Sequence, residues 1–191
     1  MRALILAFTL VACGVSQGPE APNAGEGREA SARAAGSGGF RAERLSRAAA
    51  GTVAPDLALE TGPDGATETL SDIVKANPGV PVLVNLWATW CAPCLKELPT
   101  LDGLAADTKG RLVVVPVSQD LEGWKAVSPA FTAAKFPNLA TRVESQMVFG
   151  AAVGAKGLPL SILYGPDGRE VWRYAGDLDW ASAEARAALG V

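Results

Sequence analysis

Two cysteines separated by two residues, Cys91 and Cys94, are the residues of this 191-residue chain with the clearest chemical potential. They follow an apolar run at residues 82–87; Cys91 precedes a helical pattern that begins at Pro93, and Cys94 lies in its first turn. Two thiols at this spacing can close into a disulfide and reopen. Because the N-terminus of a helix stabilises negative charge, we expect the first sulfur to be a thiolate near neutral pH. The motif predicts thiol–disulfide exchange, with Cys91 as the nucleophile and Cys94 as the resolving thiol.

Composition and charge exclude several other chemistries. The chain has no histidine, which removes imidazole bases and histidine-ligated zinc or copper. It has three cysteines, so a four-thiolate metal site cannot form within one chain. We therefore predict no metal and no cofactor besides the redox-active disulfide Cys91–Cys94. The net charge of −3 gives no reason to expect nucleic-acid binding.

The third cysteine, Cys13, follows an apolar N-terminal stretch. Arg2 precedes the apolar residues 3–12, which are too few to span a bilayer and typical of a signal peptide. The sequence Leu-Val-Ala-Cys-Gly at the end of this stretch resembles the lipobox of bacterial lipoproteins. That resemblance implies a signal peptide at residues 1–12, a lipid on Cys13, and an extracytoplasmic protein anchored to a bacterial membrane and facing the periplasm. An ordinary signal that is cleaved further on is the alternative.

A flexible linker is expected between the anchor and the folded domain. Residues 13–51 are rich in Gly, Ala, Ser, Glu and Arg, and they offer little that a core could bury. Within them, residues 41–50 favour a short helix by composition alone. Residues 52–191 are enough for one domain with its own core. The sequence therefore predicts a signal peptide, a linker, and a single domain that begins at residue 52.

Strand and helix patterns alternate along this domain. Apolar runs predict buried strands at residues 82–87 and 112–117, and a helical pattern lies between them from Pro93 to Ala105. Pro99 lies inside this helix and is expected to kink it. The other expected elements are a hairpin at 57–59 and 67–70, helices from Trp124 and over 145–153, strands at 160–164 and 170–175, and a helix over 182–189.

A strand–helix–strand unit followed by a hairpin defines the expected architecture. The helix allows the strands at 82–87 and 112–117 to lie parallel, whereas the turn Gly-Pro-Asp-Gly should make the strands at 160–164 and 170–175 antiparallel. The sequence predicts an α/β fold with a central mixed β-sheet, helices on both faces and an N-terminal β-hairpin extension.

Several motifs of the domain occur together in one known family. They are the segment 84–94, which reads Val-Asn-Leu-Trp-Ala-Thr-Trp-Cys-Ala-Pro-Cys, then Glu97 and Pro99, then Gly157-Leu158-Pro159, Pro166-Asp167-Gly168 and Trp180-Ala181-Ser182. From Ala54 onward the chain resembles a thioredoxin-like fold, and more closely the membrane-anchored TlpA/ResA/CcmG-like thiol–disulfide oxidoreductases. The resemblance is specific because the cysteine pair lies between a matching strand and helix.

The resemblance implies roles for the residues around the dithiol. Pro159 would be a cis-proline, and Leu158 would offer a backbone edge to which a client chain adds as a strand. Trp90, Ala92 and Pro93 would contact the client, with Trp90 flanking the sulfurs and limiting their exposure. A trans proline in a surface loop is the alternative for Pro159.

Glu97 is the candidate for proton transfer. It lies one helical turn beyond Cys94, and a buried carboxylate there could exchange a proton with the resolving thiol. The alternative is an exposed helix glutamate beside Lys96. Asn85 occupies the strand position at which many thioredoxins carry a buried aspartate. Because an amide does not titrate, the proton-accepting role falls to Glu97 or to water.

These features predict an enzyme, an extracytoplasmic thiol–disulfide oxidoreductase that acts as a reductase. The resemblance implies client proteins with cysteine pairs, such as apocytochrome c or copper-centre proteins, and a membrane thiol carrier of the DsbD/CcdA type as electron donor. No histidine or charge lies between the cysteines to over-stabilise the thiolate. We therefore expect a reduction potential nearer to about −270 mV, as in thioredoxin, than to about −120 mV, as in DsbA.

Three other functions are weighed against this one. A peroxiredoxin-like thiol peroxidase shares the Ala-Pro-Asp opening at residues 54–56, but its Pro-x-x-x-Thr-x-x-Cys setting is absent. A Sco-like copper metallochaperone would need a wider cysteine spacing and a histidine. A non-catalytic binding lipoprotein could reuse the fold without the redox step.

Overall fold

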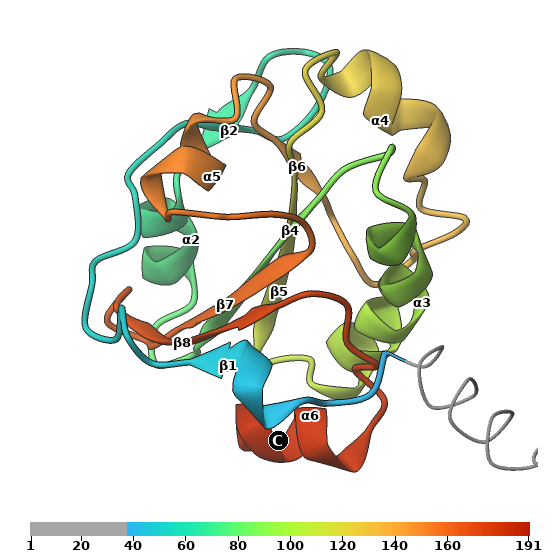
Figure 1. The fold of residues 1–191 in the computed structure, drawn as a ribbon. Helices are drawn as coiled ribbons and strands as arrows, with labels where there is room; N and C mark the ends of the chain where they lie inside the picture. The colour runs from blue at the N-terminus through green and yellow to red at the C-terminus, as the bar shows by residue number, and fades with distance from the viewer. Residues whose placement is uncertain (1–37) are drawn as a thin grey trace, which may run out of the picture. The chain divides into compact units, whose positions relative to one another are not determined.

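A mixed β-sheet of eight strands organises residues 38–191, the part of the chain that the computed structural model describes (Figure 1). The strand order is β1-β8-β7-β4-β5-β6-β2-β3. The predicted signal peptide at residues 1–12 and the predicted lipidation site, Cys13, lie outside the described residues. Among residues 38–191, no helix has the length and apolar character needed to cross a bilayer.

The centre of the sheet follows the predicted pattern. Strands β4 (Val82–Trp87) and β5 (Val113–Ser118) pair in parallel, and α3 (Ala92–Asp107) connects them. Strand β7 (Leu160–Tyr164) pairs antiparallel with β4, and β8 (Glu170–Ala175) pairs antiparallel with β7. Every residue of β4 is buried, as expected of a continuous apolar run in the middle of a sheet. The prediction of a mixed sheet is confirmed.

The remaining elements are short and cover the edges and faces of this centre. They are a 3₁₀ turn (Ala42–Arg44), β1 (Leu45–Ser46), β2 (Leu59–Glu60), β3 (Thr67–Glu68), α2 (Leu70–Ala76), α4 (Trp124–Ala130), β6 (Arg142–Val143), α5 (Val148–Ala152) and α6 (Ala183–Leu189). Strands β2 and β3 form the predicted N-terminal hairpin.

The two faces of the sheet carry separate hydrophobic cores. Helices α3, α4 and α6 pack on one face, and α2 and α5 pack on the other (Figure 1). Side chains along β4 alternate between the faces, with Leu83 and Trp87 in the α3 core and Val84 and Leu86 in the opposite one. Asn85 shares its side of the strand with Leu83 and Trp87, so it faces α3. The predicted helices on both faces are confirmed.

Three local differences from the sequence prediction have simple causes. The second hairpin strand ends at Glu68 because Thr69 caps a helix, α2, which the sequence analysis missed. Thr69 Oγ1 accepts from the Asp72 amide and the Asp72 carboxylate accepts from the Thr69 amide, a reciprocal capping box. Strand β6 is two residues long, too short for any periodicity. Helix α3 ends at Asp107, two residues beyond the predicted pattern, and the kink at Pro99 stays a prediction.

The predicted linker is wrong for residues 38–51. Strand β1 pairs antiparallel with β8 at the edge of the sheet, where Leu45 lies opposite Tyr174. The ring of Phe40 stacks on that of Tyr174 with centroids 5.6 Å apart, and the Arg41 amide donates to the Tyr174 hydroxyl at 3.0 Å. The predicted helix over 41–50 is replaced by a 3₁₀ turn and a strand. The backbone groups of an edge strand favour a pairing partner over local helix propensity.

Candidate active site

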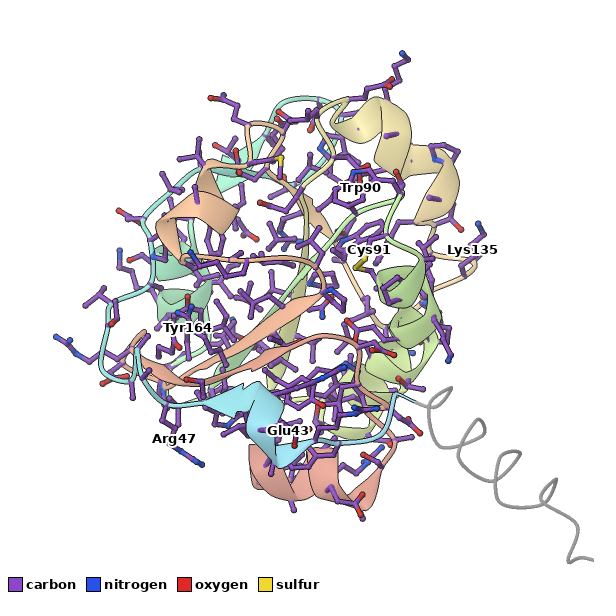
Figure 2. All side chains as sticks on the ribbon, viewed as in Figure 1. Glu43, Arg47, Trp90, Cys91, Lys135 and Tyr164 are labelled. Atoms are coloured by element: carbon purple, nitrogen blue, oxygen red, sulfur yellow. A yellow bond between two sulfur atoms is a disulfide. The ribbon has the colours of Figure 1, made fainter. Side chains whose placement is uncertain are left out.

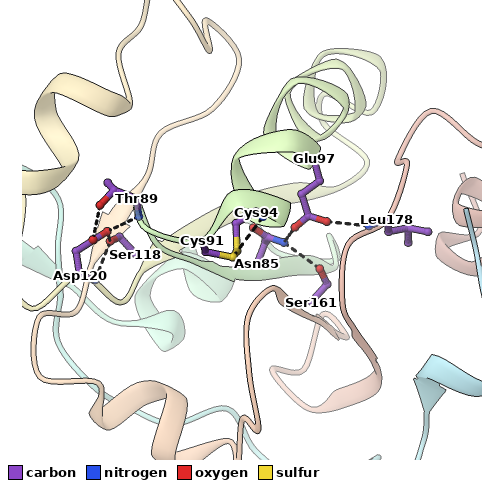
Figure 3. Close-up of a disulfide and its surroundings, with 9 residues drawn as sticks. All are labelled: Asn85, Thr89, Cys91, Cys94, Glu97, Ser118, Asp120, Ser161 and Leu178. Carbon is purple, nitrogen blue, oxygen red and sulfur yellow. Dashed lines mark hydrogen bonds between the residues drawn. A yellow bond between two sulfur atoms is a disulfide. The ribbon is translucent and has the colours of Figure 1, made fainter. Parts of the chain in front are cut away.

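Cys91 and Cys94 form a disulfide at the N-terminus of α3, with Cα atoms 5.3 Å apart (Figure 3). Cys91 is the N-cap residue of the helix, and its Sγ accepts a hydrogen bond from the Cys94 amide at 3.3 Å. Pro93 lies in the first turn of α3, where no backbone N–H is needed. Because the free N–H groups of a helix start point toward the N-cap, they are placed to stabilise a thiolate on Cys91 after reduction.

The two sulfur-bearing residues differ in accessibility. Cys91 is 5% exposed and Cys94 is fully buried, so an incoming sulfur reaches Cys91 first. Trp90 lies beside Cys91 in Figure 2, and its side chain is 65% exposed. The indole therefore offers ring surface to a partner that approaches the disulfide. That Trp90 limits the exposure of the sulfurs stays a prediction.

The backbone around Pro159 has the predicted geometry. The Leu158–Pro159 peptide bond is cis, so the trans alternative is wrong. The Pro159 carbonyl accepts from the Gly176 amide at 2.9 Å, which holds this loop against the end of β8. Neither the amide nor the carbonyl of Leu158 has a hydrogen-bond partner within residues 38–191. Leu158 thus presents free backbone groups to a chain that adds beside it.

Glu97 lies one helical turn beyond Cys94 and is buried, so the exposed alternative is wrong. One carboxylate oxygen accepts from Asn85 Nδ2 at 2.6 Å and the other from the Leu178 amide at 2.9 Å (Figure 3). Burial raises the pKa of Glu97 to about 8, and it outweighs these two hydrogen bonds, which favour the ionised form. The carboxylate of Asp177 raises the pKa further. Glu97 therefore holds a proton at neutral pH in the oxidised protein.

The surroundings of Glu97 leave polar atoms unsatisfied. Asn85 Nδ2 also donates to Ser161 Oγ at 3.0 Å, but the buried Asn85 Oδ1 has no partner among the described residues. The indole of Trp180 faces Glu97 and lowers its pKa slightly, but Nε1 does not meet the geometry of a hydrogen bond. The carboxyl group thus lies in a pocket with few donors, which is why desolvation dominates its titration.

A second buried carboxylate, Asp120, lies on the other side of the disulfide and was missed by the sequence analysis. It accepts from the Thr89 amide at 2.9 Å, from Thr89 Oγ1 at 2.6 Å and from Ser118 Oγ at 2.7 Å (Figure 3). The Cys91 amide in turn donates to the Ala88 carbonyl at 3.1 Å, which closes the turn between β4 and α3. Asp120 therefore holds the turn that presents Cys91.

The parallel pairing of β4 and β5 explains why Thr89 and Asp120 lie close together. Thr89 follows β4 and Asp120 follows β5, and these two strands are parallel. Because the carboxyl ends of neighbouring parallel strands meet at one edge of a sheet, polar residues that follow both strands lie close together. The position of Asp120 just after the second strand is the feature of the sequence that could have identified it.

A cysteine pair at the start of the first long helix of a thioredoxin-like sheet, opposite a cis-proline, defines the thiol–disulfide oxidoreductases as a class. The chain belongs to the AhpC/TSA family, whose profile matches residues 50–169. The matched residues contain the dithiol and strands β2 to β7, whereas β1 and β8 lie outside them. It confirms the class that the motifs predicted.

Individual relatives agree with this class. Thioredoxin 1 of Chlorobaculum tepidum is 30% identical over 113 residues, which cover 59% of this chain and 86% of that protein. The thiol–disulfide oxidoreductase ResA of Oceanobacillus iheyensis is 37% identical over 84 residues, 42% of this chain and 41% of that protein. The crystal structure of a putative thiol:disulfide interchange protein DsbE from Chlorobium tepidum superposes with a TM-score of 0.59 at 26% identity, covering 74% of this chain and 92% of that one. The chain is a thiol–disulfide oxidoreductase of the DsbE/ResA/thioredoxin type.

Proposed function

We propose that the protein is an extracytoplasmic, lipid-anchored reductase of disulfides in client proteins. The observation that carries the proposal is the Cys91–Cys94 disulfide, whose first residue is the more accessible one and whose second lies one helical turn before a buried acid with a raised pKa. The lipobox-like sequence that ends at Cys13 supports anchoring to a bacterial membrane on the periplasmic side. Clients would be proteins with cysteine pairs, such as apocytochrome c or copper-centre proteins.

The first chemical step is attack by Cys91. In the reduced protein its thiolate attacks one sulfur of a client disulfide, so that a bond forms between Cys91 Sγ and that sulfur while the client S–S bond breaks. The second client sulfur leaves as a thiolate. The client backbone is held beside Leu158 by the free amide and carbonyl at that position, and Trp90, Ala92 and Pro93 line the approach to the sulfur.

The second step releases the client. Cys94 gives its proton to the Glu97 carboxylate and attacks Cys91 Sγ, which reforms the Cys91–Cys94 bond and expels the client sulfur as a thiolate. Two electrons have then moved from the protein to the client, and both client thiolates take protons from water. The oxidised protein is left with a neutral Glu97, which is the protonation state that its pKa of about 8 requires near neutral pH.

The same acid serves the return reaction. A membrane thiol carrier of the DsbD/CcdA type would attack Cys91 of the oxidised protein, and Cys94 would leave as the S–S bond breaks. A leaving thiolate inside a buried pocket is costly unless it is protonated, and the neutral Glu97 carries the proton it needs. A second thiolate of the carrier then attacks the carrier sulfur bound to Cys91. This expels Cys91 as a thiolate, leaves the carrier as a disulfide and closes the cycle.

Insulin reduction tests the proposed enzyme activity. The wild-type protein should reduce insulin disulfides, with a reductant as electron source, whereas Cys91→Ser should have no activity above background. In Cys94→Ser the attack still occurs but cannot be resolved, so a client should stay on Cys91 as a stable mixed disulfide that mass spectrometry identifies. Equal activity of wild type and Cys91→Ser would refute the proposal, and peroxide consumption by the wild type would favour the peroxidase instead.

The direction of electron flow is tested by the reduction potential. Equilibration with glutathione should give a value near about −270 mV, typical of a reductant. A value above about −150 mV would make the protein an oxidant of its clients and would overturn the assignment as a reductase.

A further inference from the structure

A groove of about 460 Å³ lies beside the disulfide. Pro93 at the start of α3 and the Leu158–Pro159 peptide form the side nearest the dithiol. The other walls carry the charged side chains Arg44, Lys156, Arg173 and Asp177. A client that adds beside Leu158 would pass through this groove, so its charges bear directly on which clients are accepted.

The charges that line the groove do not cancel. Arg173 is neutralised by Glu170, which binds it through two contacts of 2.6 and 2.7 Å. Arg44 and Asp177 are 3.5 Å apart, a loose pair that stays about one-third exposed on both sides. Lys156 is exposed and forms no ion pair with any described residue. The groove is thus locally positive on a chain whose net charge is −3.

Position along the chain relates Lys156 to the client sequence. Lys156 lies two residues before Leu158 and lines the same groove, and residues 157–158 between it and β7 form a bend. An extended client chain in the groove advances about 3.3 Å per residue. Side chains two positions apart on a strand also point to the same side. A client strand that places its cysteine against Cys91 and pairs with Leu158 therefore brings a side chain about two positions from that cysteine toward Lys156.

We propose that this groove selects clients that carry Asp or Glu about two positions from the reactive cysteine. The inference rests on the proposed function, because it assumes that the client adds beside Leu158. An acidic side chain would pair with Lys156 and gain from Arg44, whereas a basic one would meet like charge. The N-terminal segment that was predicted to be linker supplies Arg44, so it takes part in client selection as well as in completing the sheet.

Paired peptides test the inference. Two peptides, each closed by one internal disulfide, differ only in Asp or Lys at the positions two residues on either side of each cysteine. Pre-reduced protein is mixed with each peptide at low salt, and the single-turnover rate constant is measured. Wild type should reduce the Asp peptide about threefold to fivefold faster, since an exposed ion pair contributes this much. The preference should disappear at high salt.

Charge variants locate the effect. Lys156→Glu should reverse the preference, and Arg44→Gln should weaken it. Lys109→Glu is the matched control, because this exposed lysine follows the far end of α3, about 24 Å along the helix from Cys91. It changes the net charge equally and should keep the wild-type preference. Thermal unfolding of each variant checks that it is folded.

The outcomes separate this inference from the proposed function. Equal rates on both peptides with wild type, or an unchanged preference in Lys156→Glu, would overturn the groove assignment while leaving the oxidoreductase activity in place. Reversal by Lys109→Glu as well would assign the preference to overall charge and overturn it too. Failure of the wild type to reduce either peptide would refute the proposed function, and the groove assignment with it.

Discussion

The two buried carboxylates on either side of the disulfide, Glu97 and Asp120, are buried to a similar extent but are solvated by different donors. Glu97 receives one side-chain amide and one backbone N–H, one on each oxygen. Asp120 receives two hydroxyls and a backbone N–H from residues of two adjacent strand ends. The comparison shows that burial alone does not assign a role. An acid with few donors is suited to exchange a proton, whereas one with several short hydrogen bonds holds neighbouring backbone in place.

The largest expected difference between the two acids is in the pH dependence of stability. The pKa of Glu97 is about 8 in the folded, oxidised protein and 4.5 ordinarily. Between these values the folded state binds the proton that the unfolded chain has released, so the free energy of unfolding should fall as pH rises. The total loss should be about 4 kcal/mol. Urea unfolding of the oxidised protein from pH 4.5 to about 8.5 measures it.

Substitutions identify the acid that causes the free energy of unfolding to fall as pH rises. Glu97→Gln should remove the slope from the unfolding series, because the amide does not titrate. Asp120→Asn should keep it. A slope that is the same in wild type and in Glu97→Gln would show that another group titrates and would break the contrast between the two acids.

The next largest effect concerns catalysis. Glu97→Gln should slow the release of the client from Cys91 about 100-fold, the usual contribution of a positioned proton acceptor. Stopped-flow measurement of the peptide reaction separates the fast attack by Cys91, which should be unchanged, from the slow resolution by Cys94. Glu184→Gln, at an exposed position in α6, is the matched control and should behave as wild type. Equal slowing of both steps would argue for distortion of the site instead of lost proton transfer.

Replacement of Asp120 should lower the stability of the folded protein. Asp120→Ala leaves the Thr89 amide and the two hydroxyls without an acceptor, which should lower the free energy of unfolding by about 2–3 kcal/mol. Urea unfolding at pH 5 measures the loss, and attack by Cys91 should also slow because its turn is no longer held. An unchanged midpoint would show that water replaces the carboxylate at no cost, and the structural role would be withdrawn.

The smallest expected effect is that of removing one of the hydrogen bonds to Asp120. Thr89→Val removes the hydroxyl that bonds Asp120 at 2.6 Å but keeps the backbone N–H bond at 2.9 Å. We expect a loss of about 1 kcal/mol, which is one hydrogen bond of ordinary strength. If Thr89→Val destabilises as much as Asp120→Ala, then the hydroxyl, and not the backbone amide, is the group that Asp120 holds.

The long elements of the fold were predictable because apolar pattern and length leave few alternatives for them. Strands β4, β7 and β8 have the predicted bounds, and β5 is shifted by one residue. Helix α2 was missed because it is only seven residues long and its signal is a capping box, not a periodicity. Strands β1 and β6 are two residues each, and they form because neighbouring strands offer unpaired backbone groups.

The site also has features that the sequence predicts and features that depend on the tertiary structure. The pairing of Cys91 with Cys94 was predictable because their sequence context is specific and local, whereas the cis bond before Pro159 was predicted from the family resemblance. The burial of Glu97 was left open, since helical position alone does not say which face a neighbouring loop will cover. In the structure, Leu178 and Trp180 from the loop after β8 close over it, about 80 residues away in sequence. The contact between Asp120 and Thr89 can be predicted only if β4 and β5 are known to pair in parallel.

The amino-acid sequence by itself determined the chemistry of this protein, because two thiols at the start of a helix carry their reactivity in their own residue types and spacing. Tertiary structure alone decided which acid holds a proton and which holds a turn. It also decided that residues 38–51 belong to the domain and that Arg44 reaches the groove. The reason is physical: solvation of a charge depends on every atom around it, and those atoms come from segments that are distant in the chain.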